Sequence, residues 1–155
     1  MPDFCHKKMK KSNHIDIFGK QLQDVYTVFI SQDINRSKEF YTKWFGFTSI
    51  FESSWFILLQ SPGQKSFPLA FMSEKHPSSP PVPKAMHGDA AFLTLQVADA
   101  ATVYEAMKSA GLPFSYQLKD EPWGQRRFAV TDPSGMHVDV VEQIEPKEGF
   151  WDPYM

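Results

Sequence analysis

Cysteine, net charge and long apolar runs are all scarce in this sequence of 155 residues. The single cysteine, Cys5, excludes an internal disulfide and makes a cytoplasmic location the expectation. A formal net charge of -2 gives no electrostatic reason to expect a nucleic-acid partner. No apolar run approaches the roughly 18 residues of a membrane-spanning helix, so we expect no membrane partner. The opening residues also lack the apolar segment of a secretory signal.

Aromatic side chains are abundant, at 15% of the chain, with 14 Phe, 5 Tyr and 4 Trp. Most of them must pack in a hydrophobic core. A surplus of flat apolar side chains also suits a pocket for a planar or apolar ligand. Composition therefore favours a globular protein that binds a small molecule.

The chain divides into three regions by composition. Residues 1–24 are lysine-rich and have little periodicity, so we expect a flexible basic extension. A domain over 25–146 follows, in which the proline-rich segment 73–89 is expected to link two modules, 25–72 and 90–146. The aromatic tail 147–155 is expected to pack against its own subunit or a second copy.

The two modules repeat one pattern. In each, an apolar strand leads to an acidic helix cap, an amphipathic helix and three further strands. Tyr26 precedes the cap Asp33 by seven residues, and Phe92 precedes the cap Asp99 by seven. Gly46 and Gly111 are expected to end the two helices. The sequence thus predicts an α+β fold built by internal duplication, with strands at 26–30, 47–51, 55–60, 68–72, 92–97, 115–119, 126–130 and 136–143.

Two stretches carry a family resemblance: SKEFYTKWFGF after the first strand, and WGQRRFAVTDPSGMHVDVVEQ near the end. Both resemble the vicinal oxygen chelate superfamily, which includes glyoxalase, extradiol dioxygenases, and fosfomycin- and bleomycin-resistance proteins. The resemblance covers about Val25 to Pro146. It implies two βαβββ modules that pair into a curved half-barrel sheet with a concave ligand site, and a homodimer.

The resemblance also implies where a metal would bind. In the metal enzymes of this family, each module supplies one ligand from its first strand and one carboxylate from its last. These positions fall at Tyr26, about Ala70, Phe92 and Asp139, and only Asp139 is a competent ligand. His137 shares the strand face of Asp139 and could add one donor. We therefore expect no metal cofactor, with a site for Zn, Ni, Mn or Fe as the alternative.

Other potential ligands have weaker positions. His76 and His87 fall in the expected linker, where histidines are usually exposed to solvent. Cys5 and His6 are adjacent in the N-terminal extension and lack the spacing of a metal site.

The hairpin that begins at Trp123 holds the other candidate site residues. Strand alternation places Arg127 on one face and Arg126 on the other. One of these arginines is expected to pair with Asp139 or with a ligand's acidic group, and a surface salt bridge is the alternative. Trp123 either lines a pocket or packs in the core.

These residues favour a metal-independent binder of a small apolar or aromatic molecule. The alternatives are a metal-dependent lyase or dioxygenase of the same superfamily, a metal-free isomerase that uses Asp139 as base, and an interaction module that docks through its tail. No catalytic residue beyond Asp139 can be named. Trp44 is a further pocket candidate that also suits a helix core. The expected ligand-binding residues are Tyr26, Trp55, Phe92, Trp123, Arg127, His137 and Asp139.

Overall fold

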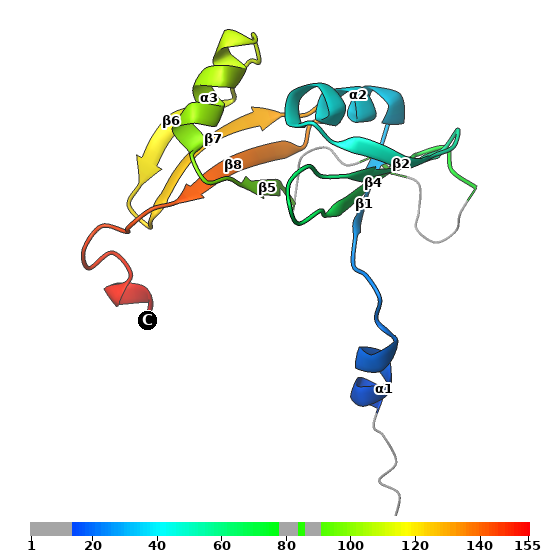
Figure 1. Cartoon of the computed structure of the whole chain (residues 1–155), viewed down its shortest axis with the longest axis horizontal. Coiled ribbons are helices and arrows are strands. Elements are labelled where there is room, and N and C mark those ends of the chain that lie inside the picture. Colours follow the sequence, from blue (N-terminus) through cyan, green and yellow to red (C-terminus); the bar gives the residue numbers. More distant parts are fainter. Residues whose placement is uncertain (1–13, 78–83, 86–90) are drawn as a thin grey trace, which may run out of the picture.

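The computed structural model describes residues 14–77, 84–85 and 91–155, and these form two modules of the same design (Figure 1). Each module has one four-stranded sheet and one helix packed on it. The elements of module one are β1 (Thr27–Ser31), α2 (Ile34–Phe45), β2 (Thr48–Glu52), β3 (Phe56–Gln60) and β4 (Pro68–Ser73). Those of module two are β5 (Leu93–Gln96), α3 (Ala100–Ser109), β6 (Tyr116–Glu121), β7 (Gln125–Thr131) and β8 (His137–Gln143).

Both sheets have the same topology. Their strand orders are β1-β4-β3-β2 and β5-β8-β7-β6, and in each the first strand of the module pairs in parallel with the last. The sheets do not close on themselves, as a half-barrel requires. The expected α+β fold with two βαβββ modules is therefore confirmed.

The helix starts follow from local chemistry. The side chain of Asp33 accepts hydrogen bonds from the backbone N–H groups of Asn35 and Arg36, and that of Asp99 accepts one from Thr102. These bonds satisfy donors that have no partner within the first turn of a helix. Gly46 then ends α2 with a φ of 68°, a left-handed conformation that glycine adopts most readily.

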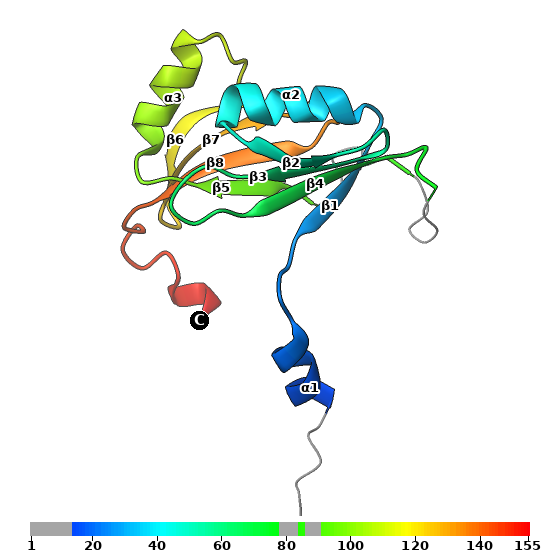
Figure 2. The ribbon, with the colours of Figure 1, turned by 45° about the vertical axis from the view of Figure 1, so that its right-hand side comes forward.

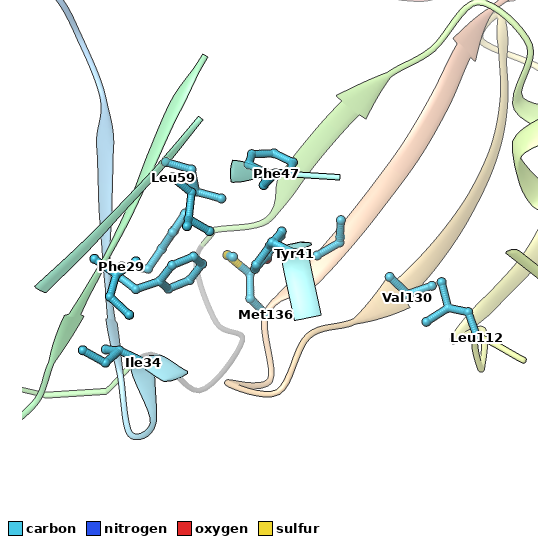
Figure 3. Close-up of a cluster of buried hydrophobic side chains, with 12 residues drawn as sticks. Phe29, Ile34, Tyr41, Phe47, Leu59, Leu112, Val130 and Met136 are labelled. Atoms are coloured by element: carbon cyan, nitrogen blue, oxygen red, sulfur yellow. The ribbon is translucent and has the colours of Figure 1, made fainter. Parts of the chain in front are cut away.

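Strand alternation gives each sheet one face toward its helix and one face away from it. The helix-side face of module one carries Phe29, Leu59 and Phe71, which are buried in the main core (Figure 3). The two module helices, α2 and α3, lie on the same side of the sheets (Figure 2). We call the sheet face that points away from the helix the open face; it corresponds to the expected concave site.

A buried hydrogen bond joins the two modules. The hydroxyl of Tyr41 on α2 donates to Oδ2 of Asp132, in the turn between β7 and β8, over 2.9 Å. Oδ1 of Asp132 accepts from the backbone N–H groups of Ser134 and Met136. Burial, followed by the charge of Asp132, raises the pKa of the Tyr41 hydroxyl above its ordinary value of 10.0. Figure 3 shows Tyr41 next to Met136, where the cores of the two modules meet.

The two ends of the described chain differ. Helix α1 (His14–Gln21) has no buried residue and stands away from both modules (Figures 1 and 2). By contrast, the C-terminal tail with η1 (Asp152–Tyr154) packs on its own chain, because Nε1 of Trp151 donates to the carbonyl of Trp123 over 3.1 Å. No helix in the described part of the chain is long and apolar enough to cross a membrane. Most of the expected linker and the start of the basic extension lie outside the described residues.

Tyr41→Phe tests the bond between the modules. We expect it to lower the free energy of unfolding by roughly 1.5–3 kcal/mol, because it removes a hydrogen bond to a buried carboxylate. Because the folded-state pKa is raised, the contribution of Tyr41 is complete below pH 10.0 and is lost at higher pH, as the unfolded chain ionises. Urea denaturation at neutral and alkaline pH measures both effects. Tyr154→Phe, on an exposed residue, is the control, and equal loss in both variants would contradict the assignment.

Candidate functional site

The sheet register identifies which side chains meet on the open faces. Val28 pairs with Ala70 across β1 and β4, and Thr94 pairs with Asp139 across β5 and β8. Paired residues point to the same face, so these four are neighbours in two symmetry-related pairs. Tyr26 and Phe92 precede their strands and are 51% and 62% exposed. The register thus places Val28 and Thr94, two residues further along the chain, beside Ala70 and Asp139.

This quartet does not fit a metal centre. Only Thr94 and Asp139 carry side-chain oxygens, and Val28 and Ala70 carry no donor. Within the described ranges, no group of three or more His, Cys, Asp or Glu side chains is placed to hold a metal ion. The Asp139 carboxylate is instead engaged by a guanidinium group.

Arg127 is the centre of a polar cluster on the open face of module two. Its Nε donates to Oε1 of Glu121 over 3.1 Å, and its Nη1 donates to Oδ1 and Oδ2 of Asp139 over 3.3 and 3.4 Å. The side chains of Glu121 and Asp139 are only 4% and 8% exposed, against 21% for Arg127. Arg127 therefore pairs with both nearly buried carboxylates, whose burial without a partner would be costly, and Lys119 adds a second cation 4.0 Å from Oε2 of Glu121.

Two aromatic rings flank the guanidinium of Arg127. Its central carbon lies 4.6 Å from the ring centre of Tyr116 and 5.4 Å from that of Trp123. These are distances at which a cation is attracted to an aromatic face. The hydroxyl of Tyr116 also donates to Oε1 of Glu121 over 2.6 Å. We call Tyr116, Glu121, Trp123, Arg127 and Asp139 the arginine cluster.

Hydrogen bonding controls the ionisation of Glu121. Its pKa is lowered from the ordinary value of 4.5, first by the bond from Tyr116 and then by the bond and charge of Arg127. Burial opposes this shift, since it disfavours the ionised carboxylate.

Sequence reasoning missed both Tyr116 and Glu121. A register irregularity lies between Tyr116 and Lys119 in β6, and Tyr116 pairs with Ala129, on the open face of β7. Simple alternation along β6 places Tyr116 and Glu121 on opposite faces, because they are five residues apart. The bulge reverses this parity and brings the two side chains together.

The two adjacent arginines have different partners. Arg126 points to the other face and pairs with Asp120 through an Nε–Oδ1 contact of 2.6 Å in an exposed position. It is thus the surface salt bridge, whereas Arg127 is the arginine that pairs with Asp139.

A glycine turn positions Trp123. Gly124 has a φ of 105°, and a Cβ there would lie 2.9 Å from the carbonyl oxygen of Ile144. Only glycine combines that conformation with such a close backbone approach. The indole Nε1 of Trp123 donates to Oε1 of Gln125 over 2.9 Å, and its ring lies 6.4 Å from that of Phe150 in the tail. Trp123 therefore connects the arginine cluster, to which it belongs, with the tail.

The structure separates the remaining candidates from this cluster. His137 and Phe92 meet edge to face, with ring centres 6.0 Å apart, and no bond joins His137 to Asp139 in the described part of the chain. Trp55 belongs to module one and packs on Phe56. Of the predicted site residues, the structure thus brings together Trp123, Arg127 and Asp139, and separately Phe92 and His137.

The expectation that His76 is exposed is wrong. His76 is buried, with 7% of its surface accessible, and its ring nitrogens have no hydrogen-bond partner among the described residues. His76 lies three residues after the end of β4, and its backbone N–H donates to the carbonyl of Ser73, the last residue of that strand. His87, Cys5 and His6 lie outside the described residues.

Comparison with known proteins agrees with this architecture. The sequence-family model of the Glyoxalase/Bleomycin resistance protein/Dioxygenase superfamily matches residues 13–140 of this chain. The chain belongs to this superfamily. None of the curated proteins compared with it matches significantly.

Solved structures share the fold at low sequence identity. A glyoxalase/bleomycin resistance protein/dioxygenase from Nocardioides is 19% identical, covers 88% of this chain and 98% of its own, and has a TM-score of 0.65. A superfamily member from Sphaerobacter thermophilus is 21% identical over 79% of this chain and 98% of its own, with a TM-score of 0.63. The bleomycin resistance determinant encoded on transposon Tn5 has the same identity and coverages, with a TM-score of 0.55.

Removing the central cation tests the arginine cluster. We expect Arg127→Met to lower the free energy of unfolding by roughly 2–3 kcal/mol, because Glu121 and Asp139 lose their shared partner. The neighbouring variant Arg126→Met removes only an exposed ion pair and is expected to change stability little. Denaturant unfolding of both variants measures the difference. A loss in Arg126→Met as large as that in Arg127→Met would contradict the assignment.

The depressed pKa of Glu121 predicts a pH dependence of stability. A carboxylate with a lowered folded-state pKa contributes stability above its unfolded value, here 4.5, and loses it as pH falls through the folded value. Tyr116→Phe removes the largest cause of the shift, so its stability is expected to fall less steeply between about pH 5 and pH 3. Unfolding midpoints across this range measure the slopes, and parallel curves would refute the expectation.

Proposed function

We propose that this protein binds a small planar, largely apolar molecule on the open face of module two, without a metal ion. The observation that carries the proposal is the Arg127 guanidinium, held by two nearly buried carboxylates between the rings of Tyr116 and Trp123. Such fixed polar groups beside aromatic surface are what a small-molecule site needs for orientation and affinity.

The arginine cluster retains capacity for a ligand. Nε and Nη1 of Arg127 bond to Glu121 and Asp139, while Nη2 has no protein acceptor in the described part of the chain. A ligand oxygen or ring nitrogen that accepts a hydrogen bond from Nη2 would lie close to Trp123. Thr94 and Gln96 are exposed on the same face and supply further hydrogen-bonding groups at its edge.

A binding role accounts for these residues better than catalysis does. Both oxygens of Asp139, the expected candidate base, already accept hydrogen bonds from Arg127. The arginine cluster contains no Ser or Cys, and Nζ of the nearby Lys119 forms an ion pair with Glu121, 4.0 Å from Oε2. These groups specify no reaction class. The similar fold of the Tn5 bleomycin resistance determinant supports a resistance-type or sequestering role, by analogy of fold alone.

A second copy of the chain is the partner we propose for the open faces. Several apolar side chains remain exposed on or beside them, including Tyr26, Phe51 and Phe92 at 51%, 54% and 62%. Burying such side chains is a common source of stability for homodimers, and it would enclose a ligand bound at the arginine cluster.

Tryptophan fluorescence against a panel of planar aromatic compounds tests the proposed binding. We expect quenching in the wild type, loss of most of the quenching in Trp123→Leu, and affinity weakened about tenfold in Arg127→Lys, because lysine cannot reproduce the planar fork. Arg126→Lys is the matched control on the opposite face and should bind normally. A chelator should leave binding unchanged. Binding that requires added metal, or that is retained in full by both site variants, would refute the proposal.

A further inference from the structure

A cavity lies at the junction of the two modules. Its volume is about 750 Å³, within the range of ligand pockets. Its wall combines the end of α2, the β3–β4 loop, the edge strand β5 and one side of α3. Helix α2 belongs to module one, whereas β5 and α3 are consecutive elements of module two, so the cavity wall joins segments from both modules.

The cavity is distinct from the arginine cluster. Leu93 and Leu95 of β5 and Val140 of β8 line it and pack on the helix side of the sheet. Asp139, beside Val140, points to the open face with Arg127. The cavity therefore shares none of the five side chains of the arginine cluster, and the two sites approach each other only at the edge strand β5, whose Thr94 and Gln96 also line the cavity.

Apolar side chains make up most of the cavity wall. Trp44, Phe45 and Phe47 come from α2 and the residues after it, and Val103 and Met107 from α3. Phe47 is buried in the main core, and the other four pack against the hydrophobic clusters. An apolar cavity of this size favours a ligand with a hydrocarbon or aromatic body.

One cation stands at the rim. The ammonium group of Lys65 lies 5.3 Å from the ring centre of Phe67, and both residues line the cavity. No carboxylate pairs with Lys65 in the described part of the chain. The loop is braced, because Ser61 accepts the N–H of Phe67 through Oγ over 2.8 Å and donates its own N–H to the Phe67 carbonyl over 3.0 Å. Lys65 is thus an unpaired cation on a braced loop.

We infer that the junction cavity binds an amphiphilic carboxylate, with its apolar body between α2, β5 and α3 and its carboxylate next to Lys65. The apolar wall of the cavity is complementary to the hydrocarbon body of such a ligand, and the ammonium group of Lys65 is complementary to its carboxylate. This inference does not rest on the proposed function, because the cavity lining includes no side chain of the arginine cluster.

Decanoate and decanol are suitable probes, because they share an alkyl chain and differ in charge. Calorimetric titration of the full chain should give saturable decanoate binding. Lys65→Met should weaken decanoate binding by about fivefold and leave decanol binding unchanged. Lys75→Met, an exposed lysine on the turn after β4, is the matched control and should change neither.

Two further substitutions show where decanoate binds: one fills the junction cavity, and the other removes a side chain of the arginine cluster. Val103→Trp should weaken both probes by about tenfold, because the indole takes the space of the alkyl chain. Trp123→Leu should leave both affinities unchanged. Loss of decanoate binding in Trp123→Leu, with binding retained in Lys65→Met and Val103→Trp, would overturn the inference and assign the ligand to the arginine cluster. Absence of saturable decanoate binding, or equal weakening of both probes by Lys65→Met, would also overturn it.

Discussion

The packing of α2 against both modules is the constraint on which the other features depend. Tyr41 contacts the ring of Phe71 in the first sheet and donates to Asp132 in the second module, so one buried side chain serves both cores. Because the helix sides of the sheets are used for this packing, their opposite faces remain free for other contacts. The same arrangement leaves the junction cavity between the end of α2 and α3. In each sheet, the helix side thus contributes to stability through core packing, and the opposite face remains accessible to other molecules.

Asp139 shows how a side chain can neutralise a carboxylate within a buried strand. A carboxylate between Val138 and Val140, in the middle of a buried strand, requires a compensating charge. Arg127 does not lie directly across from it, since the register pairs Asp139 with Ala129 and Arg127 with Val141. A long side chain reaches this diagonal neighbour, and its planar fork contacts Glu121 as well. The guanidinium therefore supplies the positive charge that the buried carboxylate of Asp139 requires.

Local sequence patterns predicted much of this structure because they depend on near neighbours. Asp33 and Asp99 cap helices through backbone groups two or three residues away, and alternation placed Arg126 and Arg127 on opposite faces. The bulge before Lys119 could not be foreseen in this way, because it depends on how β6 pairs with β7. The burial of His76 likewise depends on how the chain turns after β4. Local patterns could not predict the junction cavity either, because its wall combines segments of both modules that meet only in the folded chain.

Strand β8 contributes side chains to both proposed binding sites, because its residues alternate between the two faces of the sheet. Asp139 and Val141 point to the open face, while Val138 and Val140 point to the helix side. The strand is almost fully buried, so a ligand on one face is separated from the other by a single layer of backbone. The two surfaces nevertheless select different chemistry, because one has a cation already shared by two carboxylates and the other an apolar wall with an unpaired lysine at its rim. A neutral planar ligand therefore suits the arginine cluster, and an anionic amphiphile suits the cavity.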